Sequence, residues 1–280
     1  MNEPLRLPAP NLFQARAARF RQLARTHSSL VGYLSLIADL AGAQHGVWES
    51  CAPAAAPNSP MDGPPLDFAA WPRDPAWREG LRCIAERLDS GGGPLAALCG
   101  RIRQAADADL ETWAEALLNA AIESLDPGLA PLVAAALQTC WTSRAAGLDA
   151  RNFSAIDSGS RCPLCGAWPV ASLLQSGGTV QGLRYLHCWL CSTEWHRPRI
   201  QCIHCGSAEH VAYFGIEGAG EAVKAEACGA CNTYVKIMNR EKEPRADPFA
   251  DDLASLALDL LMAEEGYERF GFNPFLIPSG

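Results

Sequence analysis

Eight cysteines in the second half of the chain form four Cys-x-x-Cys pairs. The pairs are themselves repeated, because each cysteine of the first two pairs recurs 40 residues later, as Cys162 does at Cys202. A fixed period of this kind marks an internal repeat. The chain therefore holds two copies of one small unit, whose cysteines are Cys162, Cys165, Cys188, Cys191, Cys202, Cys205, Cys228 and Cys231.

The spacing inside each pair suits metal binding. Two residues between the cysteines allow a tight turn that points both sulfur atoms at one centre and leaves backbone N–H groups to donate to them. Gly166 and Gly206, which follow the first pair of each unit, permit a positive φ in that turn. Two such turns per unit supply four sulfur ligands in a tetrahedral arrangement. The repeat thus predicts two metal sites, one formed by Cys162, Cys165, Cys188 and Cys191 and the other by Cys202, Cys205, Cys228 and Cys231.

The identity of the metal stays open at this stage. Four-sulfur geometry suits zinc and iron, and the chemistry of structural sites by itself favours zinc. Disulfides, interleaved ligand sets and catalytic dithiols are the alternatives to two separate metal sites. Because each unit is too small to bury much apolar surface, we expect the bound metal to supply folding energy.

Composition limits the other possibilities. The chain has 280 residues, 49% hydrophobic and 19% charged, which is typical of a globular protein. Its net charge of −8 and the scarcity of lysine argue against nucleic-acid binding. No apolar run is long enough to span a membrane, and residues 1–10 lack the features of a secretory signal. We expect a cytoplasmic protein without membrane insertion, whose thiols stay reduced.

The first half of the chain, residues 1–157, is predicted to be an all-helical domain. Apolar residues recur at helical spacing, and proline- and glycine-rich breaks separate the segments. The expected helices cover residues 13–24, 30–41, 74–88, 94–105, 110–124 and 127–146, with an exposed loop at 51–65.

The second half mixes short strands with a final helix. Alternating segments predict strands at residues 168–174, 180–186, 210–216 and 222–227. Asp247-Pro248 has the pattern of a helix N-cap followed by proline, so one helix is expected over residues 247–265, followed by an apolar tail that docks on the protein. The predicted fold class is α+β and multi-domain, with an all-α domain at 1–157, four-cysteine modules at 158–200 and 201–243, and a helix with its tail at 244–280.

No catalytic site is predicted. Cys83, Cys99 and Cys140 lie in apolar helical stretches, where a reduced cysteine acts as a small hydrophobic residue. His187 and His204 adjoin cysteine quartets that are already complete, so we expect them to support the sites or lie on the surface without binding metal. The acidic pair at residues 251–252 suits the start of the final helix better than acid–base catalysis.

Several longer stretches carry a family resemblance. Residues 182–196, with the sequence GLRYLHCWLCSTEWH, resemble the signature of FdhE, the formate dehydrogenase accessory protein. The same is true of residues 224–231 with Tyr234 and Lys236, of residues 251–256, and of residues 273–276. Together with the cysteine pairs, the resemblance covers roughly residues 160–278.

The resemblance implies a function that the spacing of the cysteines does not. Proteins similar to FdhE are cytoplasmic assembly factors for respiratory, membrane-associated formate dehydrogenases. They bind the catalytic subunit, which carries molybdopterin, an iron–sulfur cluster and often selenocysteine, before its export. Their tandem modules are rubredoxin-like and the family is associated with iron. The resemblance therefore favours iron over zinc at the eight cysteines.

From these observations we predict a non-enzymatic, metal-binding maturation factor that binds the formate dehydrogenase catalytic subunit. Iron in a four-sulfur site can exchange one electron, so a redox role is one version of this hypothesis and a purely structural role is the other. The alternative function is a tandem zinc ribbon that binds another protein or a nucleic acid. A dithiol oxidoreductase is less consistent with the sequence, because both quartets are complete and leave no thiol to spare.

Overall fold

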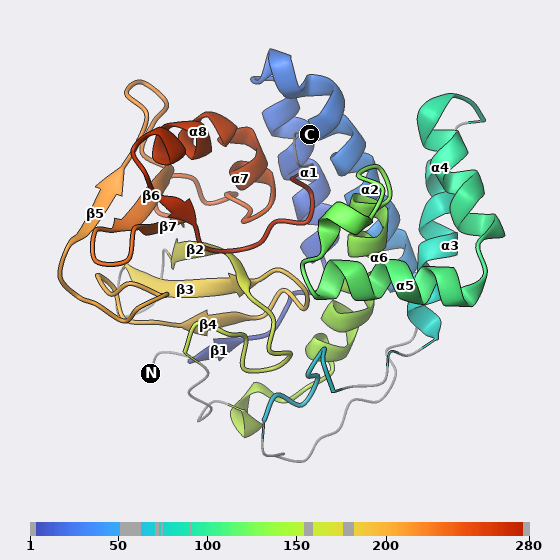
Figure 1. Ribbon diagram of the computed structural model, residues 1–280, viewed down its shortest axis with the longest axis horizontal. Helices are drawn as coiled ribbons and strands as arrows, with labels where there is room; N and C mark the ends of the chain where they lie inside the picture. The colour runs from blue at the N-terminus through green and yellow to red at the C-terminus, as the bar shows by residue number, and fades with distance from the viewer. Residues whose placement is uncertain are drawn as a thin grey trace.

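The computed structural model describes residues 4–50, 63–70, 73, 75–89, 91–153, 159–175 and 182–276. Most of the loop expected at residues 51–65 lies outside these ranges. The helices of the first half form one side of the molecule, and a sheet covered by two short helices forms the other (Figure 1). The predicted fold class, an α+β protein with a helical N-terminal region, is confirmed.

Six α-helices lie in the described part of the N-terminal region. The last of them is the central one, because nearly all its residues are buried whichever way they face. It packs against the second, third and fifth helices. The helices are α1 (Leu12–Ala24), α2 (Val31–Ser50), α3 (Ala76–Leu88), α4 (Gly93–Gln104), α5 (Asp107–Leu118) and α6 (Ala130–Ala146).

Strand β1 from the N-terminus and the strands of the second half join in one sheet with the order β1-β4-β3-β2-β7-β6-β5, and β8 also pairs with β7. The strands are β1 (Leu5–Arg6), β2 (Pro169–Gln175), β3 (Leu183–Cys188), β4 (Glu194–His196), β5 (Val211–Phe214), β6 (Val223–Cys228), β7 (Thr233–Asn239) and β8 (Glu268–Arg269). The sequence patterns indicated β2, β3, β5 and β6 but not the other four. Two of those four, β1 and β8, have only two residues each, which is too short to show alternation.

The internal repeat is visible in the sheet. β2, β3 and β4 form one antiparallel unit, and β5, β6 and β7 form the other. The two units are joined by parallel pairing of β2 with β7, which sets Ser172 opposite Ile237. The modules thus share a continuous sheet, and the N-terminal strand β1 extends it beyond β4.

The final helix is broken, contrary to the single helix expected over residues 247–265. α7 (Ala250–Ala254) ends and α8 (Leu256–Glu264) begins on either side of Ser255. The buried ammonium of Lys236 donates to the carbonyl oxygens of Asp252 and Ser255, at 2.9 and 3.0 Å. The hydroxyl of Ser255 donates to the carbonyl oxygen of Asp251. These contacts hold the carbonyls at the end of α7 in a turn, so the helix stops there.

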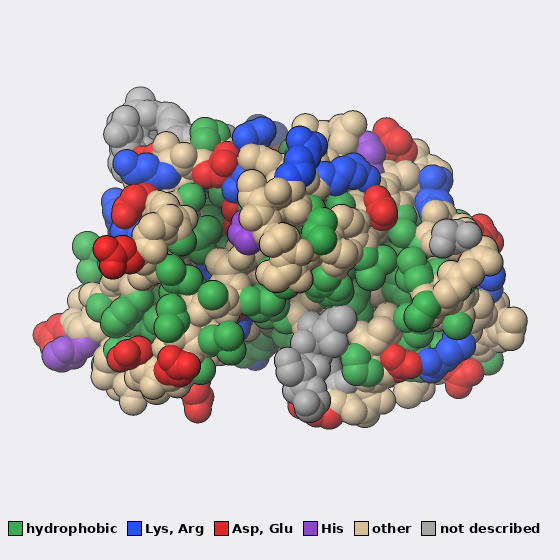
Figure 2. All heavy atoms as spheres, turned by 90° about the horizontal axis from the view of Figure 1, so that it is seen from above, with side chains coloured by type: hydrophobic (Ala, Val, Ile, Leu, Met, Phe, Trp, Pro, Cys, Tyr) green, Lys and Arg blue, Asp and Glu red, His purple; other side chains and the backbone are tan. Residues whose placement is uncertain are grey.

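α8 covers the second unit of the sheet. Its Leu258 and Met262 are buried against Ala227 and Tyr234. The opposite side of α8 is open, with Leu260 among the most exposed large hydrophobic residues. Figure 2 shows hydrophobic surface on the part of the molecule that carries α8, with Asp and Glu side chains beside it.

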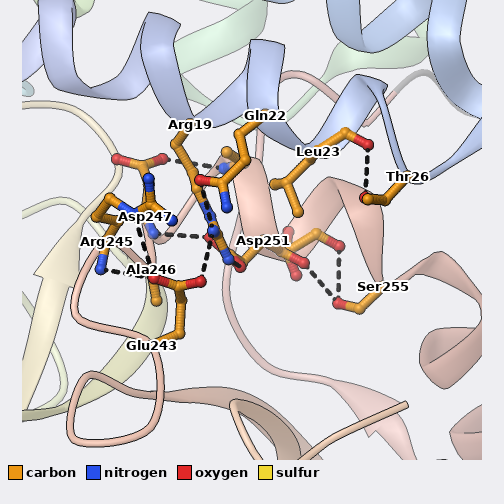
Figure 3. A network of polar contacts seen from close by, with 12 residues as sticks. Arg19, Gln22, Leu23, Thr26, Glu243, Arg245, Ala246, Asp247, Asp251 and Ser255 are labelled. Atoms are coloured by element: carbon orange, nitrogen blue, oxygen red, sulfur yellow. Dashed lines mark hydrogen bonds and ion pairs between the residues drawn. The ribbon is translucent and has the colours of Figure 1, made fainter.

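Charged contacts fasten the first helix to the C-terminal segment. The guanidinium of Arg19 on α1 donates to Asp251 through Nε at 2.9 Å and to Glu243 through Nη1 at 2.9 Å (Figure 3). Arg16, one turn earlier, contacts Asp247 at 3.2 Å. All of these groups except Glu243 are buried, so α1 is held against the residues that precede and begin α7.

Candidate metal centres

The first quartet forms where two turns meet at one end of the β2–β3–β4 unit. Cys162 and Cys165 lie in the turn before β2, Cys188 is the last residue of β3, and Cys191 lies in the turn that leads to β4. The Sγ atoms of Cys162 and Cys191 are 3.5 Å apart, and those of Cys165 and Cys188 are 3.4 Å apart. All four ligand atoms lie within 4.8 Å of one another.

Backbone geometry fixes the first turn as the sequence indicated. Gly166 has a φ of +74°, a conformation that favours glycine, and its N–H donates to the carbonyl oxygen of Cys162 at 2.9 Å. Gly206 has a φ of +77° and makes the same contact with Cys202 at 3.0 Å. In the second turn of the first unit, the N–H groups of residues 190 and 191 donate to the sulfur of Cys188.

The second quartet repeats this arrangement at the equivalent turns of the β5–β6–β7 unit. The sulfurs of Cys202 and Cys231 are 3.7 Å apart, as are those of Cys205 and Cys228. A metal bound tetrahedrally by four sulfurs at about 2.3 Å separates each pair of sulfurs by about 3.8 Å. The second quartet matches that spacing closely, and the first is slightly tighter. Both quartets could hold a metal ion.

The chemistry of the first quartet also fits a metal. Burial raises the pKa of the Cys162 and Cys165 thiols well above the ordinary value. Four thiols brought together without water can all become thiolates only if a cation neutralises them. Zinc and iron both accept four thiolates, so the donor set fits either metal and does not choose between them.

One pair of site residues was not anticipated. Thr193 lies 3.1 Å from the sulfur of Cys191, and Thr233 lies 3.1 Å from the sulfur of Cys231. A hydroxyl at this distance can donate to a thiolate and tune its charge. The two threonines are themselves 40 residues apart, so the repeat period contained the signal that would have identified them.

The two quartets differ in how well they are covered. Every cysteine of the first is 0% exposed, whereas in the second Cys205 is exposed and Cys231 is half-buried. The helical region covers the first site, because Gln138 of α6 donates to the carbonyl oxygen of Trp189 at 2.8 Å. The ring of Trp189 also packs on Phe272 of the tail, with centroids 5.1 Å apart.

The remaining sequence candidates are not ligands of either quartet, although the backbone N–H of His204 donates to the sulfur of Cys202 at 3.4 Å and its side chain contacts Cys231. Cys99 is buried, and Cys83 and Cys140 are half-buried, within the helical region. His187 is buried beside Glu194, with Nδ1 3.5 Å from the carboxylate, and His204 is exposed. Among the described residues, the two cysteine quartets are the only groups of three or more potential ligands close enough to share a metal.

No helix in the described ranges combines the length and apolar character needed to cross a membrane.

The fold and the site together define a class of protein. A helical N-terminal region covers the first of two four-cysteine units, and the two units are fused into one sheet. The chain belongs to the FdhE family. Family models described as the N-terminal, central and C-terminal domains of FdhE match residues 2–157, 161–199 and 200–276. The family resemblance of the sequence motifs is therefore confirmed.

Relatives match along nearly the whole chain. "Protein FdhE homolog" from Cronobacter sakazakii is 39% identical, with 98% of this chain and 91% of the relative covered. "Protein FdhE" from Salmonella dublin is also 39% identical, with 99% and 92% covered. The crystal structure of the FdhE protein from Pseudomonas aeruginosa is 35% identical, with a TM-score of 0.88 over 99% of both chains. The similarity thus includes the helical region as well as the cysteine units.

Proposed function

We propose that this protein is a cytoplasmic accessory factor that binds the catalytic subunit of a respiratory formate dehydrogenase and supports its maturation. The observation that carries the proposal is full-length membership of the FdhE family, since the helical region and both cysteine units match together. An accessory role needs a surface for the client protein, and a helical region fixed to a continuous sheet supplies a rigid one.

We further propose that all eight cysteines bind metal and that the two sites have different roles. The first quartet, wholly buried, holds a metal that fixes the fold. The second, with Cys205 exposed, holds a metal that meets solvent and the client. Iron is the metal favoured by the family resemblance, and zinc satisfies the same ligands. Bound iron would supply one-electron exchange; bound zinc would supply structure alone.

A non-catalytic role is supported by what the acidic residues of the final helices do. Asp251 binds the guanidinium of Arg19, and Asp252 accepts from Arg269 at 2.7 Å and lies 3.2 Å from the ammonium of Lys236. Carboxylates held in buried ion pairs serve packing and are not positioned to transfer protons to a substrate. The pair that most resembled an acid–base site is therefore structural.

Affinity capture tests the proposal. The tagged protein, purified anaerobically, should retain the catalytic subunit of a respiratory formate dehydrogenase from the same source and contain two metal ions per chain. The substitution Cys205→Ser removes the exposed ligand of the second quartet, so it should halve the metal content and weaken capture of the catalytic subunit. The control substitution Cys83→Ser in α3 should change neither. Failure to retain the catalytic subunit, combined with normal formate oxidation in cells that lack the protein, would refute the accessory role.

A further inference from the structure

A groove of about 660 Å³ lies between α1 and the segment that connects β7 to α7. One wall is the outward face of α1, where lining residues recur at helical spacing from Leu12 to Arg25. The other wall is formed by residues between Arg240 and Asp247, and Gln175 at the end of β2 closes one side. Its volume is within the range of protein ligand sites. It lies apart from both cysteine quartets, none of whose residues line it.

Arginines dominate the charge of this groove, although the whole chain is acidic. Four arginines line it, and Asp247 is the single acidic residue among the described lining residues. The carboxylate of Asp247 is already engaged, because it contacts Arg16 and accepts from the backbone N–H groups of residues 249 and 250. The carboxylate therefore does little to offset the arginines for an incoming ligand.

Two of the four arginines are used internally. Arg19 is held by Asp251 and Glu243 (Figure 3), and Arg240 donates to the carbonyl oxygen of residue 246 and to Glu194, both at 3.0 Å. These ion pairs fix the shape of the two walls. They leave the charge for ligand binding to the remaining two arginines.

Arg25 and Arg245 supply that charge from opposite walls. Arg25 is exposed at the end of α1, and no ion pair joins it to any residue in the described ranges. Arg245 is 71% exposed in its side chain; its Nε lies 3.5 Å from the carboxylate of Glu243, which also accepts from the backbone N–H of Arg245 at 3.1 Å. Guanidinium groups on both sides of a groove can each bind a carboxylate in a two-point contact.

The length of the groove and its apolar lining residues favour a peptide over a small anion. The lining residues on this wall run from Leu12 to Arg25, 14 residues that cover a length of about 20 Å. An extended peptide of about six residues has the same length. Ala15 and Ala18 are exposed along this face, and with Leu12 and Pro244 they offer apolar contacts that a phosphate ion would not use.

We propose that this groove binds an extended, acidic segment of a partner protein, with Arg25 and Arg245 as the residues that recognise its carboxylates. The inference deepens the proposed accessory function, because the segment would belong to the client. The apolar residues of the segment would lie along α1, and its carboxylates would face Arg25 at the C-terminal end of α1 and Arg245 on the opposite wall.

Peptide retention on the immobilised, metal-loaded protein tests the proposal. One pool holds random hexapeptides of Asp, Glu, Leu and Ala, and the matched pool replaces the acidic residues with Lys and Arg. We expect enrichment of the acidic pool at low salt, decreasing as salt rises. The double variant Arg25→Ala/Arg245→Ala should reduce retention about tenfold, as expected for losing two solvent-exposed ion pairs. Arg21→Ala, an exposed arginine of α1 that pairs with Asp39, is the matched control and should have no effect.

Three results would overturn the proposal. They are equal retention of both pools, undiminished retention by the double variant, and complete displacement of the acidic peptides by millimolar pyrophosphate, which would identify a small-anion site instead. The assay contains no formate dehydrogenase, so it can fail while capture of the catalytic subunit succeeds. Loss of capture with intact peptide retention would instead contradict the accessory function alone.

Discussion

The unequal cover of the two quartets should make their metals leave at very different rates. A chelator can approach the second site directly, because Cys205 is exposed and Cys231 is half-buried. At the first site all four cysteines are 0% exposed, so the surrounding structure must open before a chelator can reach the metal. Exposing the metal-loaded protein to excess chelator should therefore release one equivalent quickly and the second slowly.

The ratio of the two release rates follows from the contacts that must break before a chelator can reach the first quartet. The cover of the first quartet includes the hydrogen bond from Gln138 to Trp189 and two backbone hydrogen bonds, from Leu66 to Leu164 and from Phe68 to Cys165. At roughly 1 kcal/mol each, their loss costs about 3 kcal/mol, which slows release about 100-fold. Opening the site would also expose the buried ring of Trp189, which slows release further, so the 100-fold ratio of the two release rates is a minimum.

A coloured chelator and stopped-flow absorbance would measure both phases under anaerobic conditions. Two phases of equal amplitude, separated by about two orders of magnitude, are expected. Cys205→Ser should abolish the fast phase and keep the slow one, and Cys165→Ser, at the equivalent position of the first unit, should do the reverse. Release of both equivalents at one rate from the unmodified protein would show that burial does not control access, and the reasoning would be wrong.

Two further predictions concern ion pairs of the sheet, one around Glu194 of β4 and one between Lys236 of β7 and Asp252 of α7. Burial raises the pKa of Glu194, but contacts with His187 and Arg240 outweigh burial and lower this pKa to about 2, from an ordinary value of 4.5. The carboxylate therefore stabilises the fold above its ordinary pKa by about 3 kcal/mol, a contribution that disappears as the pH falls through about 2. Glu194→Gln should lower the free energy of unfolding at pH 7 by that amount in urea titrations, and a change below about 0.5 kcal/mol would contradict the assignment. Asp252→Ala should cost about 3–5 kcal/mol, since it removes a buried carboxylate from the ammonium of Lys236; a melting temperature within a degree of the unmodified protein would count against it.

The cysteine spacing was sufficient to predict which residues gather in each quartet. Sulfurs held in tight turns depend mainly on local sequence, and a duplicated spacing leaves few ways to group them. The same local reasoning located the glycines with positive φ. The 40-residue repeat period also relates the two threonines that contact Cys191 and Cys231, but the cysteine spacing alone did not identify them.

Contacts between distant segments explain what the sequence did not predict. The break at Ser255 depends on Lys236, a residue on β7 whose ammonium reaches the carbonyls at the end of α7. Helical periodicity in residues 247–265 carries no information about that contact. The parallel pairing of β2 with β7 is equally non-local, so the repeat predicted two modules without their shared sheet.

The placement of α1 and β1 also has a consequence for how the chain is made. β1 pairs with β4, and Arg19 of α1 binds Asp251, which lies 232 positions later in the sequence. A ribosome produces the N-terminus first, so these residues must wait until most of the chain has been synthesised before they meet their partners. Until then the charged face of α1 has no counterpart and the first strand has no sheet to join. Completion of the fold, including the contact of α1 with the start of α7, should therefore be a late event that follows translation of residue 251.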